Sequence, residues 1–238
     1  MAPTLQDVTI SPTLRALVGV PDGSGPWPAV VVVHEAFGIL PEMREQVQHL
    51  AHLGYLAVMP DLYTQGGMRK CIGATFRALR SGEGKAWRDL KAARSWIGER
   101  DDTTGAVGVI GFCMGGAFAL LAATRGDYDV ASVNYGMLPA DLDVVESSCP
   151  VVASFGAKDR TLKDAAARLS AAYEKHGVAA DVREYPDAGH AFLNSRMTGP
   201  SILHPLMRVA GIGPNPAAAA DAWQRITAFF DAHGLERG

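Results

Sequence analysis

The sequence predicts an α/β fold with a mostly parallel central sheet and helices on both faces. Short apolar, β-branched runs alternate along the chain with longer segments of helical periodicity, and this is the pattern of βαβ units. The apolar runs show no polar/apolar alternation, so each strand is expected to be buried on both faces. The length of 238 residues suits one domain of this class over residues 1–238.

The elements can be placed from the apolar runs, the helical spacing and the glycines and prolines between them. The expected strands are residues 29–34, 55–60, 106–112, 130–135, 150–155 and 180–185. The expected helices are residues 42–53, 85–99, 115–124, 161–176 and 217–233, with Gly54 closing the first. Two N-terminal runs, 7–10 and 15–20, fit an antiparallel hairpin at one edge of the sheet.

Two stretches, residues 61–84 and 194–216, break this alternation and are rich in glycine or proline. Loops carried by a rigid scaffold often hold the residues that bind and react. We therefore expect both stretches to be loops over a site.

Composition and charge exclude several classes of protein. The net charge is −3 and the basic residues are scattered, so no nucleic-acid partner is expected. No apolar stretch approaches the length of a membrane span, and the first residues lack the basic and apolar parts of a signal peptide. A cytoplasmic location and a monomeric state are the default expectations.

The three cysteines, Cys71, Cys113 and Cys149, are odd in number and widely spaced. They form no Cys-x-x-Cys pair and no zinc-type cluster with histidine, so neither a disulfide framework nor a metal site is predicted. No cofactor is implied either. A thiol redox protein is disfavoured because no second cysteine lies nearby to resolve an oxidised one.

The segment Gly111–Gly116, GFCMGG, joins an expected strand to an expected helix. It has the Gly-x-nucleophile-x-Gly pattern of a nucleophile elbow, with Cys113 in place of serine. Such a turn would hold the thiol at a helix N-terminus, where the helix dipole favours thiolate. The backbone N–H of Met114 would face the same space and could stabilise an oxyanion. The alternative is a small buried cysteine with glycines required only for close packing.

An acid and a base follow later strands in the order that such an elbow requires. Asp159 lies in the turn after the strand that ends near residue 155, and His190 follows the strand that ends at residue 185. Rival acids are Asp141, Asp143 and Asp164, but none directly follows a buried strand. Each candidate could also be structural, Asp159 as a helix cap and His190 as a core histidine. The pattern predicts a Cys-His-Asp triad on an α/β-hydrolase fold.

At this point the sequence resembles the dienelactone hydrolase family of α/β-hydrolases. The segments that carry the resemblance are HEAFG at 34–38, PDLY at 60–63, GFCMGG at 111–116, NYG at 134–136, the turn 156–159 and AGHAF at 188–192. The resemblance as a whole covers most of the chain, from about residue 8 to about residue 231. The resemblance implies a hydrolase of lactones or carboxylic esters that requires no cofactor.

The same resemblance implies roles for individual residues. Cys113 would be the nucleophile, His190 the base and Asp159 its orienting acid. Glu35 would help to generate the thiolate when substrate binds, and the N–H groups of Ala36 and Met114 would form the oxyanion hole. A buried carboxylate after an apolar strand is costly unless it has a partner. The alternative for Glu35 is therefore a salt bridge, with Arg44 as a candidate.

One position departs from the family. Dienelactone hydrolases hold the substrate carboxylate with an arginine a few residues after the histidine, and here Asn194 stands where that arginine is expected. Arg196 is displaced, and Arg69, Arg77 and Arg80 cannot be aligned to a second such arginine. A dienelactone, another lactone and a neutral ester therefore all remain possible substrates.

Four aromatic residues are candidates for the acyl pocket: Phe37, Trp87, Tyr135 and Phe192. The alternative for each is a place in the core. Two further functions also remain open. One is a broad-specificity carboxylesterase or thioesterase with the same triad, and the other is a non-catalytic binding protein on a hydrolase fold.

Overall fold

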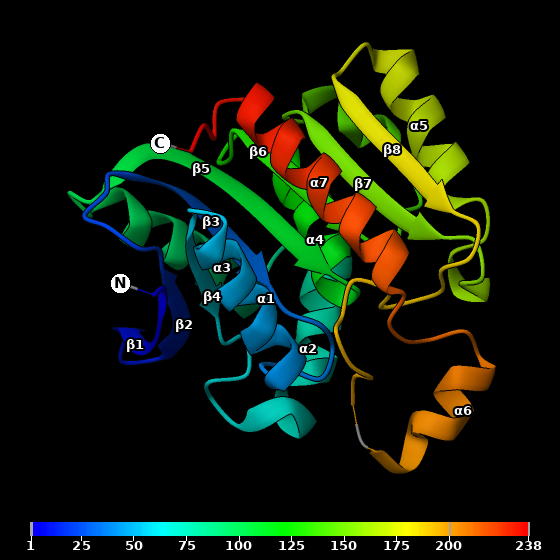
Figure 1. Cartoon of the computed structure of the whole chain (residues 1–238), viewed down its shortest axis with the longest axis horizontal. Coiled ribbons are helices and arrows are strands. Elements are labelled where there is room, and N and C mark those ends of the chain that lie inside the picture. Colours follow the sequence, from blue (N-terminus) through cyan, green and yellow to red (C-terminus); the bar gives the residue numbers. More distant parts are fainter. Residues whose placement is uncertain (1, 200, 238) are drawn as a thin grey trace.

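The computed structural model describes residues 2–199 and 201–237. Its centre is an eight-stranded sheet with the order β1-β2-β4-β3-β5-β6-β7-β8 (Figure 1). The strands are β1 (Thr4–Ser11), β2 (Leu14–Val20), β3 (Trp27–Val33), β4 (Leu56–Pro60), β5 (Thr103–Phe112), β6 (Val130–Asn134), β7 (Val151–Gly156) and β8 (Ala180–Tyr185). All pairings from β4 to β8 are parallel, which confirms the predicted mostly parallel sheet.

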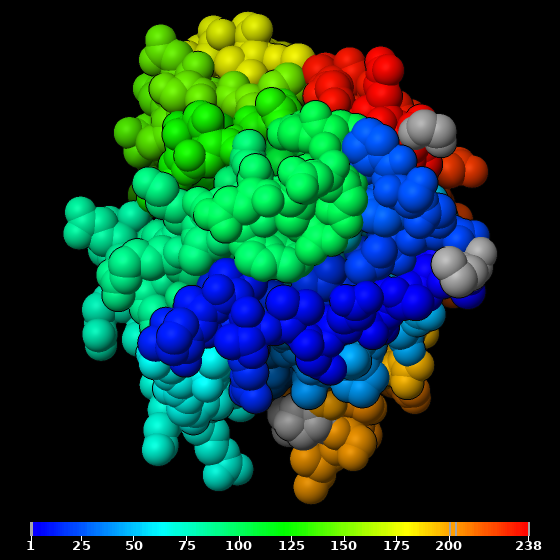
Figure 2. Space-filling model, turned by 90° about the vertical axis from the view of Figure 1, so that its left-hand side faces the viewer, coloured from blue at the N-terminus to red at the C-terminus, as the bar shows by residue number. Residues whose placement is uncertain are grey.

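The predicted N-terminal hairpin is present at one edge of the sheet. β1 pairs antiparallel with β2, and β2 pairs antiparallel with β4. Figure 2 looks onto this edge, where the hairpin (dark blue) crosses the middle of the surface. Burial increases from this edge inward, since β1 is partly exposed whereas Val30, Val31, Val32 and Val33 of β3 are fully buried. Continuous β-branched runs thus mark the strands with helices on both sides.

Helices cover both faces of the sheet, as the alternation of elements predicts. The longer helices are α1 (Pro41–His52), α2 (Gly67–Ser81), α3 (Lys85–Gly98), α4 (Met114–Ala123), α5 (Ala165–His176) and α7 (Pro216–Ala232). α1 and α7 lie on one face, with α3 and α4 on the other (Figure 1). α1 and α7 touch directly, because the rings of His49 and Trp223 are 4.5 Å apart. Gly54 follows the α1 cap Leu53 with φ 93°.

The two stretches predicted as loops are both partly helical, so that prediction was wrong in part. Residues 61–84 contain α2, which begins after Gly66 and ends at Gly82, both with positive φ. Ala78 and Leu79 are buried, so packing on neighbouring helices stabilises α2 despite a glycine at position 73.

Residues 194–216 contain a 3-10 turn (Ser201–Leu203) and the short α6 (His204–Val209). Figure 1 shows α6 projecting beyond the carboxyl ends of the strands. The predicted helix 161–176 is also interrupted, because Asp164 adopts φ 59° between a 3-10 turn and α5. In the described ranges, no helix combines the length and apolarity needed to cross a membrane.

Candidate active site

The segments that leave the parallel strands meet at the carboxyl edge of the sheet. Glu35 follows β3, Cys113 follows β5, Tyr135 follows β6, Asp159 follows β7 and His190 follows β8. Ligand and catalytic sites of open α/β sheets lie at this edge. The parallel topology therefore brings together residues that are up to about 155 positions apart, as the sequence-based prediction requires.

Cys113 occupies a sharp strand-to-helix turn at the N-terminus of α4. Its backbone angles are φ 57° and ψ −117°, a conformation that costs a non-glycine residue roughly 1–3 kcal/mol. A Cβ on Gly115 would lie 2.0 Å from the carbonyl oxygen of Val33, and a Cβ on Gly111 would lie 1.9 Å from that of Gly115. The glycines are therefore required by backbone contact, and the turn has the geometry expected of a nucleophile elbow.

His190 and Asp159 form a close pair beside this turn. The Nδ1–H of His190 donates to Oδ2 of Asp159 over 2.5 Å. Asp159 is held by Thr161, whose backbone N–H and hydroxyl both donate to Oδ1 at 3.0 and 2.6 Å. On its other side, His190 exchanges backbone hydrogen bonds with Gly211 and Gly213. The segment after α6 thus fixes the histidine in place.

The interaction between His190 and Asp159 favours the charged form of each side chain. Burial acts to lower the pKa of His190, but the interactions with Asp159 and Cys113 outweigh it and raise the pKa to about 10. Burial acts to raise the pKa of Asp159, but the hydrogen bonds from His190 and Thr161 lower it below its ordinary value. An imidazolium beside an ionised carboxylate is therefore the favoured state.

Glu35, after β3, has a different environment from Asp159. It is 2% exposed, and its Oε1 accepts a hydrogen bond of 2.9 Å from Nδ2 of Asn194. Its Oε2 contacts the hydroxyl of Thr198 at 2.7 Å. Arg44, the candidate partner suggested by the sequence, pairs instead with Asp7. Burial raises the pKa of Glu35, against the hydrogen bonds from Thr198 and Asn194.

The two backbone N–H groups predicted to form the oxyanion hole are those of Ala36 and Met114. No acceptor within the described residues takes the N–H of Ala36, and the N–H of Met114 belongs to the first turn of α4, where helices leave donors unpaired. The hydroxyl of Tyr63 donates to the carbonyl of Ala36 at 2.8 Å and contacts the sulfur of Met114 at 3.8 Å. Tyr63 thereby ties the two backbone segments together.

Three of the predicted pocket residues lie at the site, but two of them lie beneath its surface. Tyr135 and Phe192 are fully buried, with ring centroids 5.6 Å apart, and Tyr135 packs 5.1 Å from His190. Tyr135 thus supports the histidine from the core and Phe192 packs against Tyr135, as the core alternative expects; that they line the acyl pocket stays a prediction. Phe37 is half-buried and packs close to Gly199.

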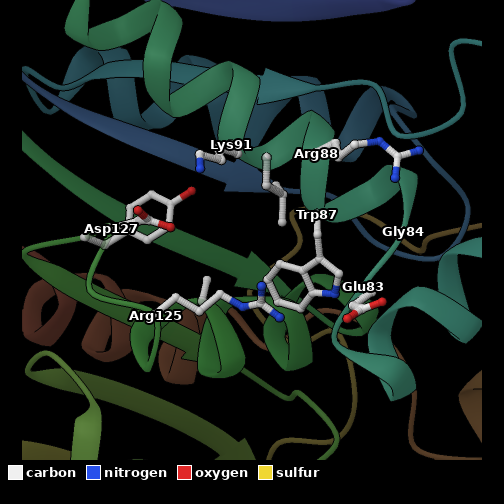
Figure 3. A pocket seen from close by; sticks show the side chains of 10 residues that line it. Glu83, Gly84, Trp87, Arg88, Lys91, Arg125 and Asp127 are labelled. Carbon is white, nitrogen blue, oxygen red and sulfur yellow. The ribbon is translucent and has the colours of Figure 1, made fainter.

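Trp87 lies elsewhere, which corrects its assignment to the acyl pocket. Its Nε1–H donates to the carbonyl of Ala78, and its ring packs 4.9 Å from Phe118. It borders an open pocket of about 700 Å³ between α3 and α4. The guanidinium of Arg125 lies over the indole there (Figure 3). The helical spacing correctly put Trp87 on a packed face but could not tell which one.

Several residues of the site had no signal in the sequence. Thr198 contacts both Glu35 and Glu42, and Gln46 donates to Asn194. Their partners are up to 163 positions away, so only the fold reveals the contacts. Among the described residues, no group of three or more His, Cys, Asp or Glu side chains could hold a metal ion.

Comparisons with known proteins agree with this geometry. The model of the dienelactone hydrolase family matches residues 14–234. A carboxymethylenebutenolidase of Pseudomonas putida is 32% identical over 198 residues, which cover 79% of this chain and 84% of that protein. A putative carboxymethylenebutenolidase of Yersinia pestis is 28% identical, over 93% of this chain and 85% of that protein.

A solved structure of a protein described as a putative dienelactone hydrolase has the same fold. A putative dienelactone hydrolase from Klebsiella pneumoniae superposes with a TM-score of 0.77 at 26% identity, covering 97% of this chain and 99% of that one. The family match covers nearly the whole chain, and the Pseudomonas relative exceeds 30% identity. The chain is therefore a hydrolase that belongs to the dienelactone hydrolase family.

Proposed function

We propose that the protein hydrolyses carboxylic esters or lactones through an acyl-enzyme formed on Cys113. The observation that carries the proposal is the 2.5 Å contact between His190 and Asp159, beside a cysteine held at φ 57° on a strand-to-helix turn. A nucleophile, a base and a group that orients the base are the three parts of a triad. The decayed site of a binding protein would not be expected to keep all three.

The reaction begins when the sulfur of Cys113 attacks the carbonyl carbon of the substrate. The oxygen that becomes negative accepts hydrogen bonds from the N–H groups of Ala36 and Met114. His190, as imidazolium, gives a proton to the leaving alkoxide oxygen, and the acyl group stays on sulfur. His190 then removes a proton from water, and the hydroxide attacks the thioester and releases the acid and the thiolate of Cys113, which takes back the proton that it gave up in the first step. Asp159 holds the histidine with Nε2 turned toward the reacting atoms.

Glu35 assists the first step by accepting the thiol proton, a role that requires it to be ionised at that moment. The raised pKa of Glu35 makes its carboxylate a better base than an exposed glutamate. Tyr63 contacts both the carbonyl of Ala36 and the sulfur of Met114, and we expect this link to hold the two donors close together. The cytoplasmic location, the monomeric state and the single domain 1–238 stay predictions from the sequence.

An uncharged acyl group is the favoured substrate class. Asn194 donates to Glu35, and Arg196 pairs with Glu45. Within residues 2–199 and 201–237, no ion pair joins a lysine or arginine to Glu35. An anionic acyl group near Glu35 would have no lysine or arginine paired with that carboxyl group to compensate its charge. We therefore favour neutral esters or lactones, as a carboxylesterase of this family would take, over an anionic dienelactone.

A panel of substrates tests the chemistry and the substrate class together. Wild type and C113A are assayed with cis- and trans-dienelactone, p-nitrophenyl acetate and p-nitrophenyl butyrate, with C149A as a matched cysteine control. We expect kcat/KM to fall at least about 10³-fold in C113A and to stay unchanged in C149A. Near-normal hydrolysis by C113A would refute the mechanism. A preference for the anionic lactones would refute the substrate class alone.

A further inference from the structure

Two buried carboxyl groups contact the same hydroxyl beside the site. Oγ1 of Thr198 lies 2.7 Å from Oε2 of Glu35 and 2.6 Å from Oε1 of Glu42. The three side chains are 4, 2 and 4% exposed, respectively. They come from the segment after His190, from the end of β3 and from the first turn of α1. The triad described above does not use Glu42 or Thr198.

The number of hydrogens on Thr198 limits the charge of this cluster. A threonine hydroxyl carries one hydrogen, and an ionised carboxylate carries none. If both carboxyl groups were ionised, Thr198 could donate to only one of them. The other contact would then bring two oxygen lone pairs together at the distance of a strong hydrogen bond. Both contacts are favourable only if one carboxyl group is protonated and donates to Thr198.

We propose that Glu35 and Glu42 share one proton through Thr198, and that Glu42 and Thr198 are positioning residues that set the charge of Glu35. In the described ranges, no lysine or arginine forms an ion pair with either carboxyl group. The shared proton, and not a basic side chain, therefore neutralises one of the two negative charges. Without that proton, two negative charges would be buried next to each other, which is costly.

The resting position of the proton is Oε2 of Glu35. Glu42 lies in the first turn of α1, where the positive end of the helix dipole stabilises a negative charge. Oδ1 of Asn194 accepts from Gln46 at 3.2 Å, so its Nδ2 donates to Oε1 of Glu35 and leaves Oε2 toward Thr198. Burial raises the pKa of Glu35, and the nearby charge of Glu42 raises it further.

The other titratable groups around Glu35 do not supply a fixed cation next to it. His190 acts to lower the pKa of Glu35, but its Nδ1 is bonded to Asp159. The phenol of Tyr135 is fully buried, and its hydroxyl has no partner among the described residues. Burial, with the nearby Glu35 and Cys113, raises the pKa of that phenol far above its ordinary value, so it stays neutral.

The shared proton gives Glu35 a way to become ionised without solvent. The proton on Oε2 of Glu35 moves to Oγ1 of Thr198 while the hydroxyl proton of Thr198 moves to Oε1 of Glu42. Glu35 is then a carboxylate, Glu42 is a neutral acid, and the charge of the cluster is unchanged. If the proposed function holds, Glu35 can then accept the proton of Cys113, and the reverse movement restores the resting state after that proton has left.

Infrared spectroscopy tests the shared proton without relying on hydrolysis. At neutral pH we expect the C=O stretch of a buried, protonated carboxylic acid in wild type, shifted in D2O. The band should be retained in T198S, which keeps the hydroxyl, and lost in both E42Q and E35Q. E45Q is the matched control, because Glu45 lies on the same helix but pairs with Arg196; the band should remain.

Two results would overturn the proposal. One is the absence of the band in wild type, which would mean that both carboxyl groups are ionised. The other is its retention in E42Q or in E35Q, which would mean that one carboxyl group holds the proton without the other. Thermal unfolding of each variant verifies that it is folded. An inactive enzyme with the expected bands would instead refute the proposed function and leave the shared proton intact.

The pH profile of kcat/KM provides a second readout that a purely structural role would not move. E42Q should shift the pH limb assigned to Glu35, whereas T198S should leave it in place. An equal loss of kcat at every pH in E42Q would contradict the positioning role.

Discussion

Asp159 and Glu35 are both buried carboxyl groups at the carboxyl edge of one sheet, yet their surroundings shift their pKa values in opposite directions. Asp159, after β7, contacts the imidazolium of His190 and accepts two hydrogen bonds from Thr161, and its pKa is lowered. Glu35, after β3, contacts the amide of Asn194 and the hydroxyl of Thr198, which also contacts the carboxyl group of Glu42, and its pKa is raised. When two carboxyl groups of one site have pKa values shifted in opposite directions, one stays ionised and the other can exchange a proton. Here Asp159 has the first role and Glu35 the second.

The largest effect is expected when the charge of Asp159 is removed. D159N should lower kcat/KM by about 10²–10⁴-fold, because an amide can hold the wrong tautomer of His190. Steady-state kinetics with p-nitrophenyl acetate measure this loss. Activity within a few-fold of wild type would mean that Asp159 does not orient the histidine.

The same variant has a defined effect on stability against pH. The pKa of His190 is raised from 6.5 to about 10. Its contribution to the free energy of unfolding is therefore complete below about pH 6.5 and is lost as the pH rises through about 10. The contribution of Asp159 is present above its unfolded pKa of 3.8 and is lost in acid. Urea unfolding should therefore give the largest difference between wild type and D159N from about pH 4 to 6.5.

Glu35 should show the opposite dependence. Its folded pKa is raised above 4.5, so the folded state binds more protons than the unfolded state above that pH, and stability falls as the pH rises. E35Q removes this cost. The stability of E35Q relative to wild type should increase from pH 4.5 upward. The stability of D159N relative to wild type should instead decrease as the pH rises through the acid range. A constant difference at all pH values would contradict the assignment.

A smaller effect is expected at Thr161. T161V removes the hydroxyl that donates to Asp159 at 2.6 Å but keeps the backbone N–H. We expect a loss of stability of about 1–2 kcal/mol and a fall in kcat/KM of about tenfold. T161S, which keeps the hydroxyl, should restore both. Without that rescue, the effect of T161V would come from packing.

The smallest effect is expected in the pocket of Figure 3, away from the site. R125A removes a guanidinium that lies 3.6 Å from the centre of the Trp87 ring and donates to the carbonyl of Gly82. Because Arg125 is exposed, the loss should be about 0.5–1 kcal/mol in thermal unfolding, with hydrolysis unchanged. R88A, on the same rim, is the control. A large loss of activity would place this pocket in the catalytic cycle.

The sequence alone determined the architecture. Continuous apolar runs such as 29–34 require burial on both faces, and helices of matching length between them leave only a mostly parallel sheet. The Gly-x-Cys-x-Gly pattern between an apolar run and a helical segment predicted the strand-to-helix turn. The position of an acid after β7 and a histidine after β8 followed from the same topology. These features depend on neighbours in the sequence or on the order of strands.

Only the tertiary structure decided what surrounds each charge. α2 formed in a glycine-rich stretch because packing outweighed propensity, and Trp87 faced a different pocket because periodicity gives a face but not its partner. Glu42, Gln46 and Thr198 came to Glu35 and Asn194 from α1 and from the segment after His190. Contacts over such separations leave no local pattern, because each residue alone is compatible with an ordinary helix or loop. The charge of the site was therefore decided by the fold.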